Sequence, residues 1–536
     1  MLTCGELLVE LLEGLGVDTV FGIPGVHTVE LYRGLPNTAI RHVTPRHEQG
    51  AGFMADGYAR VSGKPGVCFI ITGPGMTNIT TAMGQAYADS IPMLVISSVN
   101  NTGQLGMGGG RLHELPSQSN LVSGVAAFSH TLMRPDELPE VLTRAFAVFT
   151  GARPRPVHIE IPIDVITAPA DHVRRKLGAL PSRPGPCPHA IVRAAAMLKA
   201  AKRPLLLLGG GCADAAAEAQ RLAEALDAPT AYTINAKGVL PKGHPLALGS
   251  NQTWVPVRKR VLASDLILAI GTELGETDYD GVFDGNFRIE SPLIRIDIDA
   301  EQLNRNHPAD LAILSDARQA MQALVAALGE VPAFNAEGVG SQRAATVRAE
   351  LDAQWPANWK GQCKVLDSLQ RTLPDLIVAG DSTQPVYSGN YLFEATRTRS
   401  WFNSATGYGT LGYGLPAAIG AKLAAPQRPV IALIGDGGIQ FTLPELASAV
   451  EAGAPIIVLL WNNSGYGEIK RYMQNRDIPT LGVDIYTPDF QGLARAFGCN
   501  AEKVTSLDHL AALLETAAKA DRPTLIEVWE HADFLA

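Results

Sequence analysis

The sequence feature that most constrains the fold is a strand, turn, helix and strand pattern near the C-terminus. An apolar run over 429–434 predicts a buried parallel strand, and the turn 435–438 (Gly-Asp-Gly-Gly) follows it directly. A helical segment over 442–452 leads to a second apolar run, 455–461, which ends on two asparagines. Polar residues therefore gather at the carboxyl ends of neighbouring parallel strands, where open α/β sheets bind ligands.

This turn suits a phosphate group and a metal ion. Glycines let backbone N–H groups approach a phosphate, and the helix that follows offers its positive end to the anion. Asp436 and Asn463 bring hard oxygen atoms to adjacent strand ends, which suits Mg²⁺ held against a diphosphate. An ordinary βαβ unit can carry glycine in one turn and asparagine in the next. The joint pattern, more than the Gly-Asp-Gly triplet alone, therefore indicates the site.

Length, charge and cysteine usage narrow the class of protein. A chain of 536 residues is too long for one core and predicts about three domains. The apolar content of 46% and charged content of 18% are those of a soluble globular protein, and the net charge of −9 argues against nucleic acid or an anionic membrane as partner. The first basic residue is Arg33, so no signal peptide is expected, and no long apolar run predicts a membrane span. Six scattered cysteines without a CxxC pair indicate a cytoplasmic protein.

The first third of the chain repeats the pattern of the last third. Gly73-Pro-Gly75 follows a predicted strand over 66–71, as Gly435-Asp-Gly437 follows the strand described above. Convergence of two βαβ units on a similar composition is the alternative. The first copy has Pro74 where the second has Asp436, so it cannot hold the metal ion. The two halves are expected to share an architecture but to have different roles in the site.

A third unit separates the repeats. Strands are predicted over 204–208, 266–270 and 293–297, and a glycine triplet follows the first of them. That triplet is not GxGxxG with an acidic partner, so it is a weak sign of a dinucleotide. A linker rich in Pro, Arg and Gly is expected over 167–188, and a second linker is expected near 330–343. The predicted fold is α/β, with three doubly wound parallel-sheet domains over 1–168, 188–330 and 355–536.

Together these motifs resemble the thiamine diphosphate-dependent 2-oxo acid enzymes, such as acetolactate synthase, benzoylformate decarboxylase and pyruvate decarboxylase. The resemblance covers essentially the whole chain. It implies a pyrimidine-binding domain, a Rossmann-like middle domain and a diphosphate-binding domain, in that order. It also implies that the cofactor lies between the first domain of one subunit and the third domain of another. A homodimer is then the smallest working unit, and a homotetramer is common in the family.

The resemblance assigns roles to individual residues. Glu48, in Arg46-His-Glu-Gln49, matches the glutamate that hydrogen-bonds N1′ of the aminopyrimidine and promotes its imino tautomer. The carbonyl of Gly409 would accept from the 4′-amino group, and Leu411 would be the apolar wedge that bends the cofactor. Asp436, the side chain of Asn463 and the carbonyl of Gly465 would hold Mg²⁺. The other expected cofactor-binding residues are Pro24, Gly25, Thr383, Gln384, Gly435, Gly437, Gly438 and Tyr466.

Two histidines are candidates for the later steps of catalysis. His27 lies where related lyases carry an active-site histidine, and His113 replaces the glutamine of the acetolactate synthase Phe-Gln-Glu segment. Either residue could relay a proton or bind the substrate carboxylate. A packing or surface role is the alternative for each.

Two departures separate the chain from acetolactate synthase. Tyr472 stands where that family has a tryptophan that selects the acceptor, and the middle-domain segment 271–278 is acidic and lacks the flavin-binding arginine. FAD is therefore doubtful, which also counts against an oxidase. The segments 22–28, 46–54 and 406–413 look most like bacterial 5-guanidino-2-oxopentanoate (2-ketoarginine) decarboxylases. A cationic substrate tail would want a buried carboxylate, for which Glu114 or Glu468 are candidates.

The sequence thus predicts a thiamine diphosphate- and Mg²⁺-dependent carboxy-lyase that decarboxylates a 2-oxo acid with a long or basic side chain, such as 5-guanidino-2-oxopentanoate, to an aldehyde and CO₂. The nearest alternative is carboligation of the acetolactate synthase type. A cofactor-binding protein without catalysis is a third possibility, against which the presence of Glu48, Asp436 and Asn463 argues.

Overall fold

The computed structural model describes residues 1–280, 284–330 and 333–536, and these form two compact units. The first unit combines the two ends of the chain and consists of Met1–Ser182, Leu376–Gln384 and Asn403–Phe534. The second unit holds the middle of the chain and consists of Arg183–Asp375, Pro385–Phe402 and Leu535–Ala536. No helix among the described residues is long and apolar enough to cross a membrane.

The N-terminal domain of the first unit is a parallel sheet covered by helices. Its six strands lie in the order β2-β1-β3-β4-β6-β5. The strands are β1 (Thr19–Gly22), β2 (Arg41–Val43), β3 (Gly66–Ile70), β4 (Met93–Val99), β5 (Phe128–Thr131) and β6 (Val157–Pro162). The helices are α1 (Cys4–Gly14), α2 (Val29–Tyr32), α3 (Glu48–Ser62), α4 (Pro74–Ala88), α5 (Gln118–Val122), α6 (Leu138–Gly151) and α7 (Ile163–Ile166).

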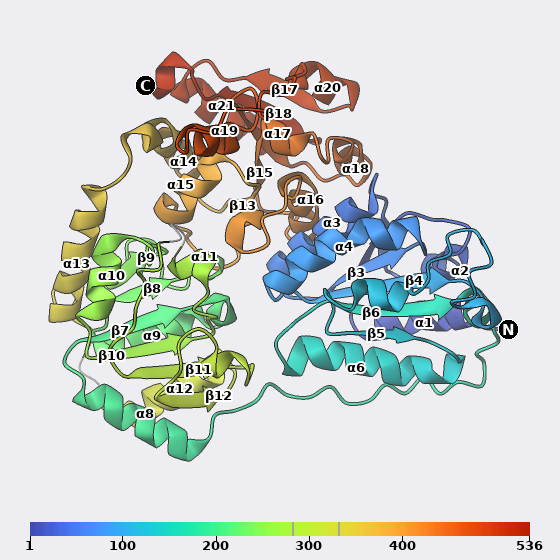
Figure 1. Cartoon of the computed structure of the whole chain (residues 1–536), viewed down its shortest axis with the longest axis horizontal. Helices are drawn as coiled ribbons and strands as arrows, with labels where there is room; N and C mark the ends of the chain where they lie inside the picture. The colour runs from blue at the N-terminus through green and yellow to red at the C-terminus, as the bar shows by residue number, and fades with distance from the viewer. Residues whose placement is uncertain (281–283, 331–332) are drawn as a thin grey trace. The chain divides into compact units, whose positions relative to one another are not determined.

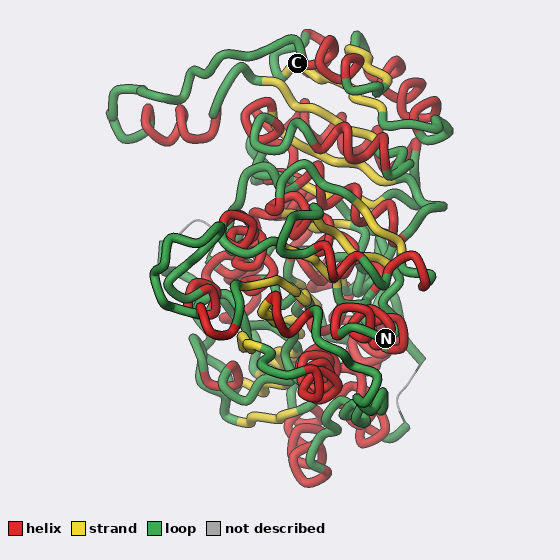
Figure 2. The backbone as a smooth tube through the Cα atoms, turned by 90° about the vertical axis from the view of Figure 1, so that its right-hand side faces the viewer, coloured by secondary structure: helices red, strands yellow, loops and turns green. Residues whose placement is uncertain are grey.

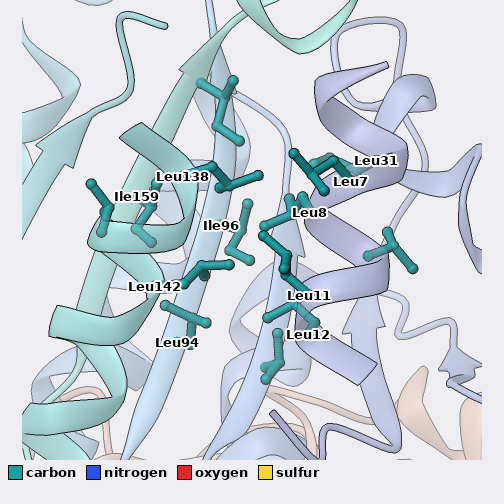
Figure 3. Close-up of a cluster of buried hydrophobic side chains, with 14 of the residues drawn as sticks. Leu7, Leu8, Leu11, Leu12, Leu31, Leu94, Ile96, Leu138, Leu142 and Ile159 are labelled. Atoms are coloured by element: carbon teal, nitrogen blue, oxygen red, sulfur yellow. The ribbon is translucent and has the colours of Figure 1, made fainter. Parts of the chain in front are cut away.

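One face of this sheet builds an aliphatic core with α1 and α6. The apolar spacing of α1 directs a leucine stripe inward, and Figure 3 shows Leu8 and Leu11 pointing toward Leu94 and Ile96 of β4. Leu142 of α6 completes the cluster, and all five side chains are buried. Figure 1 shows α3 and α4 on the opposite face of the sheet. The sheet is therefore buried on both faces, as the near-continuous apolar strands predict.

The C-terminal domain repeats the same topology. Its strand order, β14-β13-β15-β16-β18-β17, matches that of the first sheet strand for strand. The strands are β13 (Ile377–Gly380), β14 (Trp401–Asn403), β15 (Val430–Gly435), β16 (Ile457–Asn462), β17 (Asn500–Lys503) and β18 (Thr524–Trp529). The helices are α16 (Gly414–Ala424), α17 (Asp436–Ile439), α18 (Glu445–Glu451), α19 (Gly467–Gln474), α20 (Phe490–Ala496) and α21 (Leu507–Ala517). The two domains therefore share one architecture, as the internal repeat indicates.

Helices α3 and α16 occupy equivalent places in the two domains and pack against each other within the first unit. A Cβ atom on Gly57 would lie 2.0 Å from the carbonyl oxygen of Ala417, and one on Gly420 would lie 1.8 Å from that of Met54. Only glycine permits such close backbone contact. The two domains of one chain are thus joined through a tightly packed helix pair, one helix of which begins at Glu48.

The second unit carries the middle sheet. Its strand order is β12-β11-β10-β7-β8-β9, the doubly wound arrangement of Rossmann-type folds. The strands are β7 (Pro204–Leu208), β8 (Thr230–Tyr232), β9 (Ala247–Gly249), β10 (Leu266–Ile270), β11 (Leu293–Asp297) and β12 (Leu311–Leu314). The helices are α8 (Pro188–Ala200), α9 (Ala216–Leu226), α10 (Val255–Leu262), α11 (Glu276–Tyr279), α12 (Ala317–Leu328), α13 (Val339–Asp352), α14 (Lys360–Thr372) and α15 (Gln384–Leu392).

The predicted fold is confirmed, because the described residues form three parallel sheets of six strands with helices on their faces (Figure 2). Two local expectations were wrong. The helix expected over 442–452 begins only at Glu445, and α13 already begins at Val339, inside the expected linker over 330–343. Residues 331–332 of that linker and 281–283 of the expected middle domain lie outside the described residues.

Candidate active site

The candidate residues lie at the carboxyl ends of strands where the strand order of each sheet reverses. In the C-terminal sheet, β13 and β15 are parallel neighbours, and the next strands in the chain, β14 and β16, lie on opposite sides of this pair. Asp381 and Asp436 directly follow β13 and β15. In the N-terminal sheet the equivalent neighbours are β1 and β3, which Gly25 and Gly73 follow closely. Such reversal points are where open α/β sheets bind ligands.

Asp436 and Asn463 are brought together by the register of β15 and β16, which pairs Gly435 with Trp461. The Asp436 carboxylate accepts hydrogen bonds from the backbone N–H groups of Asn463 (3.2 Å) and Gly465 (2.8 Å). The side chain is 1% exposed, and burial raises the pKa of its carboxyl group. A cation beside this carboxylate would compensate for the solvent that the charge has lost.

Among the described residues, the side chain of Asn463 is hydrogen-bonded through its amide nitrogen only. Its Nδ2 donates to Glu530 Oε2 (3.0 Å), while its buried Oδ1 has no hydrogen-bond partner in the described part of the chain. Glu530 Oε2 also accepts from Trp461 Nε1 (2.9 Å), which fixes the carboxylate that orients the amide. A buried oxygen without a donor, next to a carboxylate, fits a hard divalent cation such as Mg²⁺. Sequence reasoning missed Glu530, because it lies on the strand end beyond β18 and far from the motif in sequence.

Backbone around the Gly-Asp-Gly turn is crowded by the other expected cofactor-binding residues. A Cβ on Gly435 would lie 2.9 Å from Thr383 Oγ1, and one on Gly437 would lie 2.7 Å from a ring carbon of Tyr466. A Cβ on Gly438 would lie 3.0 Å from Asp381 Oδ1. The tertiary structure therefore brings Thr383 and Tyr466 to the turn at the start of α17.

The loop between β14 and α16 has one open side. Gly407, Tyr408 and Gly409 are exposed and Leu411 is half-buried, whereas Thr410 is buried. Gly409 has φ +79°, a left-handed conformation that glycine adopts without strain. The carbonyl of Gly409 and the side chain of Leu411 thus lie on a loop that a ligand can approach.

Glu48 is the first residue of α3, and a neighbouring helix holds its carboxylate. Its Oε2 accepts from Asn78 Nδ2 of α4 (2.9 Å). A Cβ on Gly75 would lie 3.3 Å from Glu48 Oε1, so a glycine in the Gly73-Pro-Gly75 turn leaves room beside the acid. Asn78 was missed by sequence reasoning, although its place one turn into the helix after that turn could have suggested it.

A second acid, Glu445, supports the backbone that leads into α3. Its carboxylate accepts from the backbone N–H groups of Arg46 (3.0 Å) and His47 (3.1 Å), and from Ser448 Oγ (2.5 Å). Burial raises the pKa of Glu445 to about 7, against which these hydrogen bonds act. A residue of the C-terminal domain therefore supports the segment that carries Glu48.

This raised pKa predicts how stability depends on pH. Between about pH 4.5 and about pH 7 the folded protein binds more protons at Glu445 than the unfolded chain does, so stability falls as pH rises through this window. The full effect is about 3 kcal/mol. Glu445→Gln removes this titration. We expect the melting temperature of the wild type, relative to this variant, to be lower at about pH 8 than at about pH 5.

The exposed Glu451, on the same helix, provides the control. Glu451→Gln should shift the melting temperature by a similar, small amount at both pH values. Scanning fluorimetry on the protein without added cofactor measures both variants. An equal difference between wild type and Glu445→Gln at the two pH values would contradict the assignment.

His27 and His113 lie side by side, with ring centroids 5.3 Å apart. The Nδ1 atoms of both are buried and lack a hydrogen-bond partner among the described residues. Burial, and then the neighbouring His113, lower the pKa of His27, which disfavours its charged form. His113 has φ +60°, an uncommon conformation for a residue other than glycine. Paired, partly buried imidazoles of this kind can exchange protons with a ligand.

Neither carboxylate suggested for a cationic substrate tail is buried in the chain. Glu114 is half-buried and accepts from the backbone N–H groups of Arg111 (2.9 Å) and Gly109 (3.2 Å). Glu468 is exposed and is bonded to Gln384 Nε2 and Arg471. The expectation of a buried carboxylate at either position was therefore wrong for the single chain.

Comparison with known proteins identifies the class of the molecule. Models of the thiamine pyrophosphate enzymes match it in three pieces: the N-terminal TPP binding domain over residues 2–121, the central domain over 191–324 and the C-terminal TPP binding domain over 381–528. The chain belongs to the thiamine pyrophosphate (thiamine diphosphate) enzymes. This confirms the family expected from the sequence.

Individual relatives align along the whole chain. The chain is 48% identical to the probable 2-ketoarginine decarboxylase AruI of Pseudomonas aeruginosa, with 99% of this chain and 94% of that protein covered. It is 34% identical to the acetolactate synthase large subunit of Corynebacterium glutamicum, with 98% and 86% covered. It is 31% identical to the probable acetolactate synthase large subunit of Methanocaldococcus jannaschii, with 98% and 91% covered.

Proposed function

We propose that this protein is a thiamine diphosphate- and Mg²⁺-dependent lyase that decarboxylates a 2-oxo acid without oxidation, releasing an aldehyde and CO₂. Two features of one chain of this family carry the proposal. Glu48, at the start of α3, is hydrogen-bonded by Asn78, and the buried carboxylate of Asp436 lies at the end of β15. An acid that exchanges a proton with the cofactor and a metal site that anchors it are both needed for turnover.

The residues that would hold the cofactor are those of the two strand-end clusters. Asp436, Asn463 Oδ1 and the carbonyl of Gly465 would bind Mg²⁺, and the backbone of Gly435, Gly437 and Gly438 would meet the diphosphate. Thr383, Gln384 and Tyr466 would add contacts at the diphosphate, Gly409 and Leu411 at the rings, and Pro24 and Gly25 at the pyrimidine. When bound, thiamine diphosphate supplies a carbon nucleophile and an electron sink for the bond that loses CO₂.

Acidic and basic side chains of the protein would carry out the proton transfers. Glu48 would share a proton with N1′ of the aminopyrimidine, with Asn78 holding its carboxylate in place. His27 and His113 would deliver the proton that completes the aldehyde, or would orient the substrate carboxylate. The Nδ1 atoms of both rings, which have no partner among the described residues, support either role, because each can exchange a proton or hydrogen-bond with a ligand.

The proposed substrate is a 2-oxo acid with a guanidinium tail, 5-guanidino-2-oxopentanoate. The 48% identity to a probable 2-ketoarginine decarboxylase supports this choice over the acetolactate synthases, which are 31% and 34% identical. Carboligation of the acetolactate synthase type is the alternative activity.

The proposal also covers the oligomeric state, the cellular location and FAD. We infer a cytoplasmic homodimer or homotetramer with active sites at the subunit interface, and no FAD in the middle domain. Exposed apolar side chains on the segment that follows Asn463 support an interface there, since large exposed hydrophobic groups mark contact surfaces. They are Ile469, Tyr472, Ile478, Leu481 and Tyr486. The domain bounds 1–168, 188–330 and 355–536 stay predictions.

A substrate panel tests the function. The purified protein with thiamine diphosphate and Mg²⁺ is given 5-guanidino-2-oxopentanoate, its neutral isostere 5-ureido-2-oxopentanoate, benzoylformate, branched-chain 2-oxo acids and pyruvate. CO₂ release is measured, and products are identified by mass. The proposal expects 4-guanidinobutanal, with kcat/KM at least about 10-fold above that for the ureido acid, because a charged partner in the site distinguishes the two. Acetolactate from pyruvate as the best reaction would instead establish the synthase activity.

A further inference from the structure

The loop over 406–413 has an exposed part and a buried part. Gly407, Tyr408 and Gly409 are exposed and Leu411 is half-buried, and Gly409 and Leu411 carry the groups proposed above to meet the cofactor rings. The side chains of Thr406, Thr410 and Tyr413 are buried. The exposed residues of the loop are therefore accessible to a ligand, while its buried side chains can bind to the rest of the protein.

Each of the three buried side chains is hydrogen-bonded to a polar residue of the N-terminal domain. Thr410 Oγ1 donates to Gln85 Oε1 (3.0 Å), and Thr406 Oγ1 donates to Asp89 Oδ1 (2.9 Å). Tyr413 Oη donates to Asp56 Oδ1 (2.5 Å). The loop is thus tied to α3 and to the C-terminal end of α4, in the same chain.

The acceptors themselves are joined in one buried network. Arg60 donates through Nε to Asp56 Oδ1 (2.6 Å) and through a terminal nitrogen to Asp89 Oδ2 (2.6 Å). Gln85 Nε2 donates to Asp89 Oδ2 (2.8 Å). The Arg60 and Asp56 side chains are 6% and 0% exposed, and Gln85 is fully buried. Asp56 Oδ1 accepts from both Arg60 and Tyr413, while its Oδ2 has no partner among the described residues. Buried charged groups that share several hydrogen bonds have few alternative geometries, so the network restricts the position of the loop.

Tyr408 adds a steric contact between the loop and α4. A Cβ on Gly84 of α4 would lie 2.5 Å from the Cζ atom of the Tyr408 ring. The Tyr408 ring therefore packs directly against the backbone of Gly84, where any larger residue would clash with it. Gly84 immediately precedes Gln85. Gly409 lies between Tyr408 and Thr410, and both of these neighbours contact α4.

We propose that the network of Asp56, Arg60, Gln85 and Asp89 positions the loop 406–413 for the aminopyrimidine half of thiamine diphosphate, through Thr406, Thr410 and Tyr413. These are positioning residues, because they act on the cofactor through the carbonyl of Gly409 and the side chain of Leu411. This inference deepens the proposed function and rests on the placement of the cofactor rings at this loop.

The prediction separates the two ends of the cofactor. Thr410→Val keeps the shape of the side chain and leaves Gln85 Oε1 buried without its donor. The loop should then lose its preferred position, and the dissociation constant for thiamine diphosphate should rise about 10-fold in the presence of saturating Mg²⁺. Inorganic diphosphate meets only the Asp436 end. Its dissociation constant should stay within about 2-fold of wild type, since a loop that does not touch it has no differential effect on it.

The matched control is Thr230→Val in the middle domain. Thr230 is fully buried, and its Oγ1 donates to the carbonyl of Ala228 (3.0 Å), so this variant removes a comparable buried hydrogen bond. It should leave the binding of thiamine diphosphate and of inorganic diphosphate unchanged. Tyr413→Phe, which removes the donor to Asp56, should reproduce the selective loss seen with Thr410→Val.

Binding is measured on the apoprotein by titration calorimetry, with inorganic diphosphate and thiamine diphosphate as the two probes. An unchanged affinity for thiamine diphosphate in both loop variants would overturn the proposal. An equal loss for both probes would overturn it too, because a merely structural role weakens the whole site. The assay needs no substrate, so it separates failure of this inference from failure of the proposed decarboxylation.

Discussion

Glu48→Gln is expected to lower kcat on the best 2-oxo acid about 10²- to 10⁴-fold, the range that a general acid–base group supplies. Glutamine has nearly the same shape, and its amide can still hydrogen-bond at N1′ and to Asn78. It cannot release or take up a proton there. Binding of thiamine diphosphate should therefore be retained within about 10-fold, while turnover is lost. Steady-state kinetics and titration calorimetry measure the two effects separately.

The control for this variant is Glu451→Gln. Glu451 is exposed and forms an ion pair with Arg46, two residues before Glu48 in sequence. An exposed pair contributes little, so kcat should stay within about 2-fold of wild type. Retained turnover of every 2-oxo acid in the panel by Glu48→Gln would show that Glu48 is not the proton-exchanging acid.

Arg60→Met is expected to have the largest effect on stability. Methionine approximates the volume of the arginine stem but removes the hydrogen bonds that Arg60 donates to the buried carboxylates of Asp56 and Asp89. Removing one partner of a buried ion pair costs about 3–5 kcal/mol. The melting temperature of the apoprotein should fall by several degrees, and part of this loss should be recovered when both acids are also neutralised (Asp56→Asn and Asp89→Asn).

Arg33→Met is a closely matched comparison. Arg33 also donates two short hydrogen bonds, of 2.6 Å and 2.7 Å, but both go to Glu30, and its own side chain is 54% exposed. Water replaces a lost surface pair, so the melting temperature should change by less than about 1 °C. Equal shifts in the two arginine variants would show that burial does not strengthen the Arg60 network.

Much of the fold followed from local sequence patterns. Continuous apolar runs predicted parallel strands covered by helices on both faces. These runs form β3, β15 and β16, whose residues are all buried. The repeated glycine turns predicted two copies of one architecture, and the matching strand order of the two sheets agrees. The starts of α18 and α13 were misjudged, because polar and glycine-rich stretches do not by themselves distinguish a linker from the first turn of a helix.

The candidate site was less visible from sequence where its support comes from distant segments. Glu530, Asn78 and Glu445 each contact a motif residue or the backbone next to one, yet none of them lies inside a motif. Their side chains are ordinary acids and an amide whose role depends on which oxygen or N–H group the fold places within about 3 Å. Composition and spacing carry no such information.

The sequence by itself determined the class of the protein. Strand periodicity, glycine turns and the candidate metal ligands Asp436 and Asn463 are local patterns, which can be recognised without the fold. Only the tertiary structure decided how those groups are held. Asp56, Gln85 and Asp89 hydrogen-bond to the segment 406–413 because α3 packs against α16, which lies more than three hundred residues further along the chain. Burial then gives these polar contacts their strength, and burial is a property of the folded chain alone.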